Sequence, residues 1–280
     1  MDEYLSYRIF LVDSSQEELF KGDQSKESIL RELLSTIERR GKYEFIDNDV
    51  RYLFCFIKQY SNQFYILQLA REERFAKPSE REKRVETVED KRYPFIYVIF
   101  DLKRQIILIQ HKSSVFQDID TAKSKIERFF YNNFTGYGLI TTIKEMFSGL
   151  AFWEQLQQYD EIFLFDLTLT GPNLFGARYR ASDLSKDIHD NYNASEFNIK
   201  LKNSLGKLKL LKDNISDYIT LAATGAGKFV AEVAKKGIKE RIGSFTYILK
   251  KHYDKDIDKV TLNQLNIDFE ELDKHNDDKK

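Results

Sequence analysis

The sequence has one cysteine, almost no net charge and no long hydrophobic run, and each absence excludes a class of protein. Cys55 alone cannot form a disulfide within the chain, which is typical of proteins in a reducing compartment. The 44 Lys and Arg residues nearly balance 45 Asp and Glu residues, so the whole molecule attracts neither nucleic acid nor a membrane strongly. No apolar run approaches the roughly 18 residues of a spanning helix, and no basic-then-apolar leader follows Met1. We expect a soluble, cytoplasmic protein without membrane insertion.

Recognisable catalytic motifs are also absent. The sequence has no Gly-x-Ser-x-Gly elbow, and no ligand spacing relates its four histidines to one another or to Cys55. Thr224–Phe229 (TGAGKF) resembles a phosphate-binding loop, but Ala222 replaces the first glycine, and Phe229 replaces the Ser or Thr that would hold magnesium. A glycine-rich connection between two elements is the stronger interpretation. We therefore expect no metal and no cofactor.

What the chain does have is periodic hydrophobic segments. With 280 residues, of which 42% are hydrophobic and 14% aromatic, it can bury a sizeable core. Apolar residues at helical spacing, and alternating aromatic or β-branched runs, predict helices over 26–40, 120–134 and 149–158 and antiparallel hairpins over 51–70 and 94–111. The fold class that follows is α+β, with two sheet-rich units made of antiparallel hairpins and packed helices.

The clearest local unit is Gly138–Asn173, which combines a strand, a short helix and a second strand. Ser148 can cap the helix, and the second strand must end at Gly171-Pro172-Asn173, because neither glycine nor proline continues a ladder strand well. After this unit the patterns are less regular. They predict a helix over 195–211, strands over 218–223 and 229–234, a turn at 235–237 and a further extended segment over 238–247.

Composition suggests how the chain divides. Residues 71–92 (REERFAKPSEREKRVETVEDKR) contain few apolar side chains and charges of both signs, which indicates an exposed loop. The predicted organisation is an N-terminal α+β unit, a charged linker loop, a central and C-terminal α+β unit and an acidic tail, with bounds 1–75, 76–92, 93–252 and 253–280. The end of the tail is expected to be disordered.

One short pattern is compatible with an enzyme. Asp90, followed by Asp101 and Lys103, resembles the two carboxylates and the lysine of a metal-dependent nuclease core. The pattern crosses the predicted hairpin turn at 101–104, where Asp and Lys are ordinary surface residues. A nuclease is therefore an alternative to a protein that only binds.

Charge is segregated in the last third of the chain. Between Lys200 and Lys251 there are 12 Lys or Arg and four Asp or Glu residues, a local excess of eight positive charges. Such a surface can neutralise phosphates in a salt-sensitive, sequence-tolerant way; a solvated lysine-rich face is the alternative interpretation. The candidate nucleic-acid-binding residues are Lys207, Lys209, Lys228, Lys235, Lys236, Lys239 and Arg241.

The layout of the chain resembles that of uncharacterised bacterial proteins from phage-defence and abortive-infection loci, in particular RexA-like phage exclusion proteins. The residues that carry the resemblance are Phe152-Trp153, Tyr159-Asp160, Pro172-Asn173, Ala222–Gly227 and Lys236-Gly237. It implies a non-enzymatic, DNA-binding dimer in an antiviral defence system. It supplies no catalytic residue.

Partners can also be expected from the strands. A chain with many strands and no obvious edge protection should cover its edges by pairing, so we expect a homo-oligomer or a hetero-complex with another defence subunit. A protein-binding scaffold or regulatory subunit is therefore the second alternative function. Its contact surface would include apolar edges such as Phe147 to Trp153.

Overall fold

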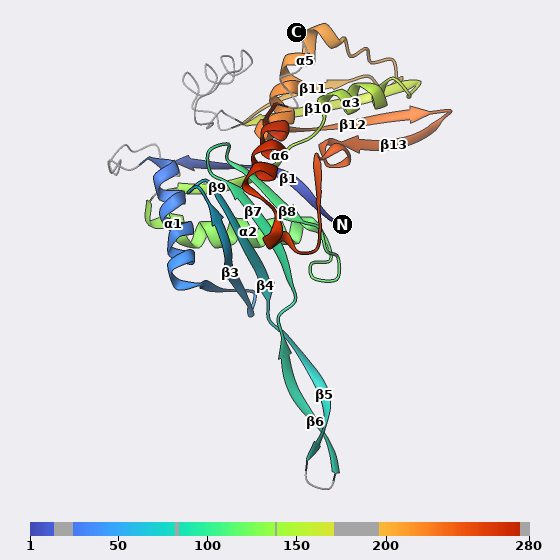
Figure 1. Ribbon diagram of the computed structural model, residues 1–280. Coiled ribbons are helices and arrows are strands. Elements are labelled where there is room, and N and C mark those ends of the chain that lie inside the picture. The colour runs from blue at the N-terminus through green and yellow to red at the C-terminus, as the bar shows by residue number, and fades with distance from the viewer. Residues whose placement is uncertain (14–24, 82–83, 138, 171–195, 275–280) are drawn as a thin grey trace.

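The computed structural model describes residues 1–13, 25–81, 84–137, 139–170 and 196–274. Within these residues five α-helices and fourteen strands build antiparallel ladders, which confirms the α+β class predicted from the sequence. The strands form an eight-stranded first sheet, a four-stranded second sheet at the top of Figure 1, and a two-stranded arm that projects at the bottom.

The first sheet has the order β14-β1-β8-β7-β4-β3-β2, with β9 also paired to β1. Its strands are β1 (Asp2–Asp13), β2 (Lys42–Asp47), β3 (Val50–Tyr60), β4 (Phe64–Arg71), β7 (Phe95–Asp101), β8 (Ile106–Gln110), β9 (Leu139–Glu145) and β14 (Lys250–Tyr253). Both predicted hairpins are confirmed, because β3 pairs with β4 and β7 pairs with β8. The first hairpin turns at Ser61 and Asn62, which both have positive φ, as a tight hairpin turn requires.

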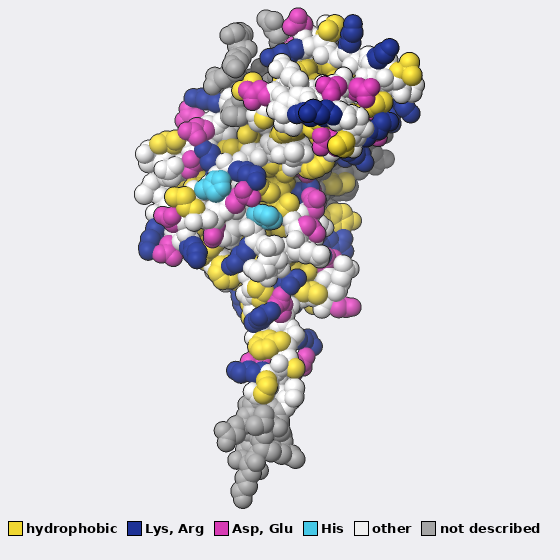
Figure 2. Space-filling model, turned by 90° about the vertical axis from the view of Figure 1, so that its right-hand side faces the viewer, with side chains coloured by type: hydrophobic (Ala, Val, Ile, Leu, Met, Phe, Trp, Pro, Cys, Tyr) yellow, Lys and Arg dark blue, Asp and Glu magenta, His cyan; other side chains and the backbone are white. Residues whose placement is uncertain are grey.

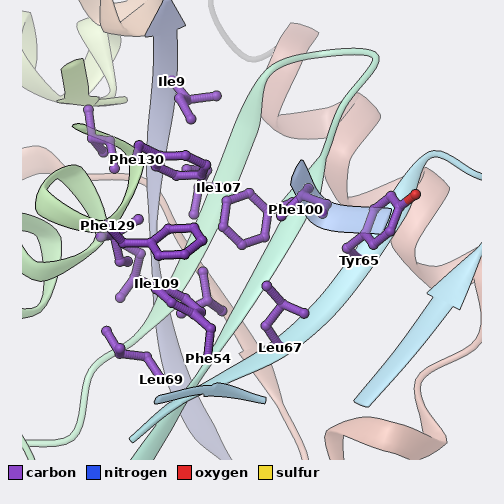
Figure 3. Packing of buried hydrophobic residues seen from close by; sticks show 14 of the residues in the cluster. Ile9, Phe54, Tyr65, Leu67, Leu69, Phe100, Ile107, Ile109, Phe129 and Phe130 are labelled. Carbon is purple, nitrogen blue, oxygen red and sulfur yellow. The ribbon is translucent and has the colours of Figure 1, made fainter. Parts of the chain in front are cut away.

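Two helices cover one face of this sheet. They are α1 (Lys26–Arg40) and α2 (Ile119–Phe134), at the positions predicted from the sequence. Ser25 caps α1 by accepting a hydrogen bond from the Ser28 amide at 3.1 Å, and Gly41 ends the helix at φ +73°. Phe129 and Phe130 of α2 point at strand residues of the sheet in Figure 3, and all of them are fully buried. Burial of these large side chains is what holds the helices in place.

The other face of the first sheet is covered by α6 (Leu262–Lys274). The sequence assigned these residues to an acidic tail and did not predict that Leu262–Lys274 of it form a packed helix. Leu265, Phe269 and Leu272 recur at helical spacing and are buried against the sheet. Because acidic residues lie on the exposed side of α6, the composition of the segment alone does not reveal this apolar stripe. The remaining tail residues, 275–280, lie outside the described part of the chain.

The charged segment expected to be a loop is instead an antiparallel hairpin. Its strands are β5 (Glu73–Arg81) and β6 (Arg84–Arg92), which together we call the arm. The arm extends away from the body of the molecule (Figure 1). Because β4 before the arm pairs directly with β7 after it, the predicted division at 76–92 does not coincide with a boundary between sheets.

The second sheet has the order β11-β10-β12-β13. Its strands are β10 (Glu161–Thr170), β11 (Glu196–Lys202), β12 (Gly227–Lys235) and β13 (Ile238–Gly243). One face, the inner face, packs on α3 (Gly149–Leu156), which was predicted over 149–158, and on α5 (Lys212–Leu221). Phe152 of α3 lies with its ring centroid 4.5 Å from that of Phe229 on β12, and Ser148 caps α3 as predicted.

Two predictions near this sheet are wrong. Residues 195–211 were expected to be helical, but Glu196–Lys202 is a strand in which exposure alternates residue by residue. The apolar residues of this stretch fit both the helical periodicity and the alternation of a strand. Pairing with β10 favours the strand. The strand expected over 218–223 is the end of α5 followed by a π turn, Ala222–Ala226, because Ile215 and Ile219 bury one helical face. The strand at 229–234 and the turn at 235–237 are confirmed.

A buried arginine joins the two sheets. Arg8 of β1 donates from Nε to the Thr224 carbonyl at 2.9 Å and from Nη1 to the Arg104 carbonyl at 2.6 Å. Its Nη2 pairs with Asp273 of α6 at 3.0 Å. Gly225, at φ +98°, lies so close that a Cβ there would be 2.4 Å from the Arg8 Cβ. One guanidinium thus fixes the π turn, the β7/β8 turn and the C-terminal helix together.

The segment from Gly171 to residue 195, including the predicted Gly-Pro-Asn stop and most of the irregular stretch after it, lies outside the described residues. None of the helices in the described ranges combines the length and apolar composition needed to cross a bilayer.

Candidate nucleic-acid interface

The face of the second sheet opposite α3 and α5, which we call the outer face, carries charged and polar side chains. On β12, Phe229, Ala231 and Val233 are buried inward, while Lys228 and Glu232 are exposed between them. Side chains alternate between the faces of a strand, so the even-numbered positions of β12 point outward, and so do the residues paired with them. No hydrophobic cluster of the described residues includes the outward Val230. The outer face therefore lacks a packed apolar layer.

Strand register places basic residues side by side on this face. One row across the sheet consists of Lys202, Leu164, Glu232 and Arg241, which are paired in that order on β11, β10, β12 and β13. A second row contains Lys200, and a third contains Lys228. Rows on one face are separated by two residues, or roughly 7 Å along a strand. Cations at this spacing can meet several phosphates of one strand.

The charges of the outer face are only partly compensated. Lys200 pairs with Asp166 at 3.4 Å. Lys202, Lys228 and Arg241 are exposed, and the described residues provide no ion pair for any of them. Around the four strands and their short connections (160–170, 196–209 and 227–243), nine Lys or Arg face six Asp or Glu, so the region is positive by three while the whole chain has a net charge of −1. Figure 2 shows this upper part of the molecule with basic, acidic and hydrophobic groups intermixed.

The seven predicted site residues do not all lie on one face of the sheet. Lys228, Lys239 and Arg241 point to the outer face, as their pairing shows. Lys235 points to the opposite face, and Lys236 lies in the turn, where its amide donates to Asp160 at 2.8 Å. These five residues therefore do not line one face of the hairpin, because one-residue steps along a strand alternate sides.

Lys207 and Lys209 follow β11 and are exposed. Lys207 forms an isolated bridge with Ile162 at the start of β10, which in turn is paired with Val233 near the Lys235-Lys236 turn. These lysines therefore lie at the hairpin end of the sheet. Sequence reasoning missed Lys200 and Lys202, because it placed them on a helix; strict alternation of polar and apolar residues over 196–202 is the signal that could have found them.

Two phenylalanines lie on the outer face among these cations. The Phe163 ring packs against Gly206 and has the Lys239 Nζ 4.0 Å from its centroid. The Phe245 ring follows β13 and lies over Gly243, where a Cβ added to the glycine would be 2.5 Å from the ring. Gly243 is paired with the outward Val230, so the ring lies on the outer face. Phe245 is 61% exposed.

The nuclease-like residues are not brought together. Asp101 is buried and accepts hydrogen bonds from Gln63 Nε2 at 2.9 Å, from two backbone amides of its own turn and from Arg104 Nη1 at 2.7 Å. Asp90 lies in the arm, beyond the far end of β7, and β7 alone spans roughly 20 Å at the usual strand rise. The described residues contain no group of three or more His, Cys, Asp or Glu that could hold a metal. Asp101 thus stabilises a turn.

Three other candidate features also have structural roles. The glycine-bearing turn at Ala222–Ala226 is buried, so its amides cannot receive a nucleotide phosphate. Cys55 is half-buried, and burial raises the pKa of its thiol, which lowers the fraction of reactive thiolate at neutral pH. Phe147, Phe152 and Trp153, proposed as a contact edge for a partner, are buried in the second core instead.

Comparison of the chain with protein-family models, with curated proteins and with solved structures finds no match.

Proposed function

We propose that this protein binds nucleic acid, with DNA as the favoured ligand, through the outer face of the second sheet. The observation that carries the proposal is the set of three exposed cations, Lys202, Lys228 and Arg241, which point outward from three of the four strands without a carboxylate partner among the described residues. Each can neutralise one phosphate without reading a base. The protein acts in this proposal as a non-enzymatic binding component.

The strength of binding follows from the number of cations. Loss of a phosphate contact flattens the dependence of log affinity on log salt by about one unit. Three contacts should give a slope of roughly −2 to −3, and the exposed lysines at the hairpin end, Lys207 and Lys236, can make it steeper. Glu232 lies between Lys202 and Arg241 in the same row and limits the attraction. We therefore expect moderate, strongly salt-dependent and sequence-tolerant binding.

A protein-binding scaffold is the second candidate, and the arm favours it. A two-stranded ribbon outside the body exposes two strand edges, and isolated two-stranded hairpins are only marginally stable in water. Pairing of an edge with a second copy or with another subunit would stabilise the arm. The setting in bacterial antiviral defence is supported by the sequence resemblance alone.

Charge reversal on the outer face tests the proposal. The variant Lys202→Glu, Lys228→Glu, Arg241→Glu should lose DNA binding in fluorescence anisotropy at 50 mM salt, and whatever binding remains should have a flatter salt slope. The variant should stay folded, because exposed cations contribute little to stability. Wild-type affinity and slope in this variant would refute the proposal.

A matched control keeps the total charge change equal. The control variant reverses three exposed lysines of the arm and the first-sheet region, Lys77, Lys112 and Lys255. It should bind DNA nearly as wild type does, apart from a weak long-range effect that salt screens. Equal loss in both variants would show that net charge alone governs binding, with no defined surface.

A further inference from the structure

We infer that the ligand of the outer face is a single strand whose bases stack on Phe245; the inference depends on the proposed function and specifies its substrate. A phenylalanine that is 61% exposed contributes little to the core, yet the Phe245 ring is held against the backbone of Gly243. Any side chain at Gly243 would displace the ring, since a Cβ there would be 2.5 Å from Phe245 Cε1. The ring thus lies against the backbone of Gly243 and leaves most of its surface open to solvent.

The pairing of β12 with β13 places the Phe245 ring near two basic side chains. Arg241 lies two residues before Gly243 on the same face of β13, and Lys228 lies two residues before Val230, the residue paired with Gly243. Both side chains therefore start within about 7–10 Å of the ring position by strand geometry. A nucleotide with its base on Phe245 can then place its neighbouring phosphates near Arg241 and Lys228.

Stacking requires an unpaired base. The bases of a duplex are stacked on one another and present only their edges in the grooves, whereas a single strand can turn a base onto an aromatic side chain. An exposed antiparallel sheet with aromatic and basic side chains interleaved is therefore suited to a single strand. Phe163 is a poorer platform, because the Lys239 Nζ already lies 4.0 Å from its ring centroid.

Oligonucleotides with and without bases provide the test. A labelled twenty-residue oligothymidylate should bind the wild-type protein at least about fivefold more tightly than an abasic oligonucleotide of equal length, since stacking of one base is worth a factor of about five to one hundred. The Phe245→Ala variant should bind both oligonucleotides alike, and Phe245→Tyr should restore the preference. An oligouridylate measured beside them distinguishes RNA from DNA as the source of the strand.

Two results would overturn the inference. One is equal affinity of the wild-type protein for the two oligonucleotides; the other is an unchanged preference in Phe245→Ala. In either case, loss of binding in the Lys202, Lys228 and Arg241 reversal variant would leave the proposed function intact. If that variant binds as wild type does, the proposed function itself fails. Unchanged thermal midpoints of the Phe245 variants exclude unfolding as the cause of a lost preference.

Discussion

Substitution of Gly225 by alanine should destabilise the protein more than the same substitution at Gly237 in the β12/β13 turn. At φ +98° an L residue is strained, at a cost of roughly 1–3 kcal/mol. The new Cβ would also lie 2.4 Å from the Arg8 Cβ, and this overpacking costs about 1–3 kcal/mol. Arg8 cannot move aside cheaply, because hydrogen bonds to the Thr224 and Arg104 carbonyls hold its guanidinium.

The two costs together amount to roughly 2–6 kcal/mol, a large part of a stability that is typically about 5–15 kcal/mol. Urea denaturation followed by the fluorescence of Trp153, which is buried in the second core, measures the loss. Gly237→Ala is the matched control for strain alone, since Gly237 has φ +80° but open space around it. Gly136→Ala, with neither strain nor contact, should be nearly neutral. If Gly225→Ala is as stable as Gly237→Ala, the close contact with Arg8 is not a constraint.

Two other predictions concern pH and assembly. Burial raises the pKa of the Glu127 carboxyl, which accepts a hydrogen bond from the Ile143 amide at 2.8 Å. The folded state therefore releases this proton at higher pH than the unfolded state does, and stability falls as pH rises between the two pKa values. Glu127→Gln keeps the acceptor oxygen and should raise the urea midpoint at pH 7 but not at pH 4; an equal effect at both pH values would contradict this. Replacement of residues 75–90 by a two-residue turn should convert an oligomer into a monomer in light scattering, while the fluorescence of the buried Trp153 shows that the rest of the chain stays folded. An unaltered oligomer would show that the arm is not the contact.

The sequence predicted those elements whose signals are local. Ser25 and Gly41 define both ends of α1, and the Ser61-Asn62 turn defines the first hairpin, because caps and turn residues act through their own backbone. Prediction from the sequence failed where packing against another element decides whether a segment forms a helix or a strand. The strand 196–202 exists because it pairs with β10, and α6 exists because the first sheet offers an apolar face to Leu265 and Phe269. Neither partner can be read from the segment itself.

The candidate site shows the same limit. A count of charges found the basic region, but charge counting does not show on which side of a strand a lysine points. Lys228 and Lys235 belong to the same strand and point to opposite faces, whereas Lys202 and Arg241, about forty residues apart in sequence, share one row across the sheet. Phe245 could not be selected in advance, because only the packing of its ring on Gly243 places it on the outer face.

Lysine footprinting tests the central claim most directly, because it locates the ligand on the protein. The protein is acylated briefly with and without a saturating twenty-residue oligothymidylate, and the labelled lysines are quantified by mass spectrometry. If the outer face binds nucleic acid, Lys202 and Lys228 should be protected, while Lys112 and Lys255 should react as they do in the absence of the oligonucleotide. Protection confined to Lys77 and other lysines of the arm, or no protection at a concentration that saturates binding, would contradict the account.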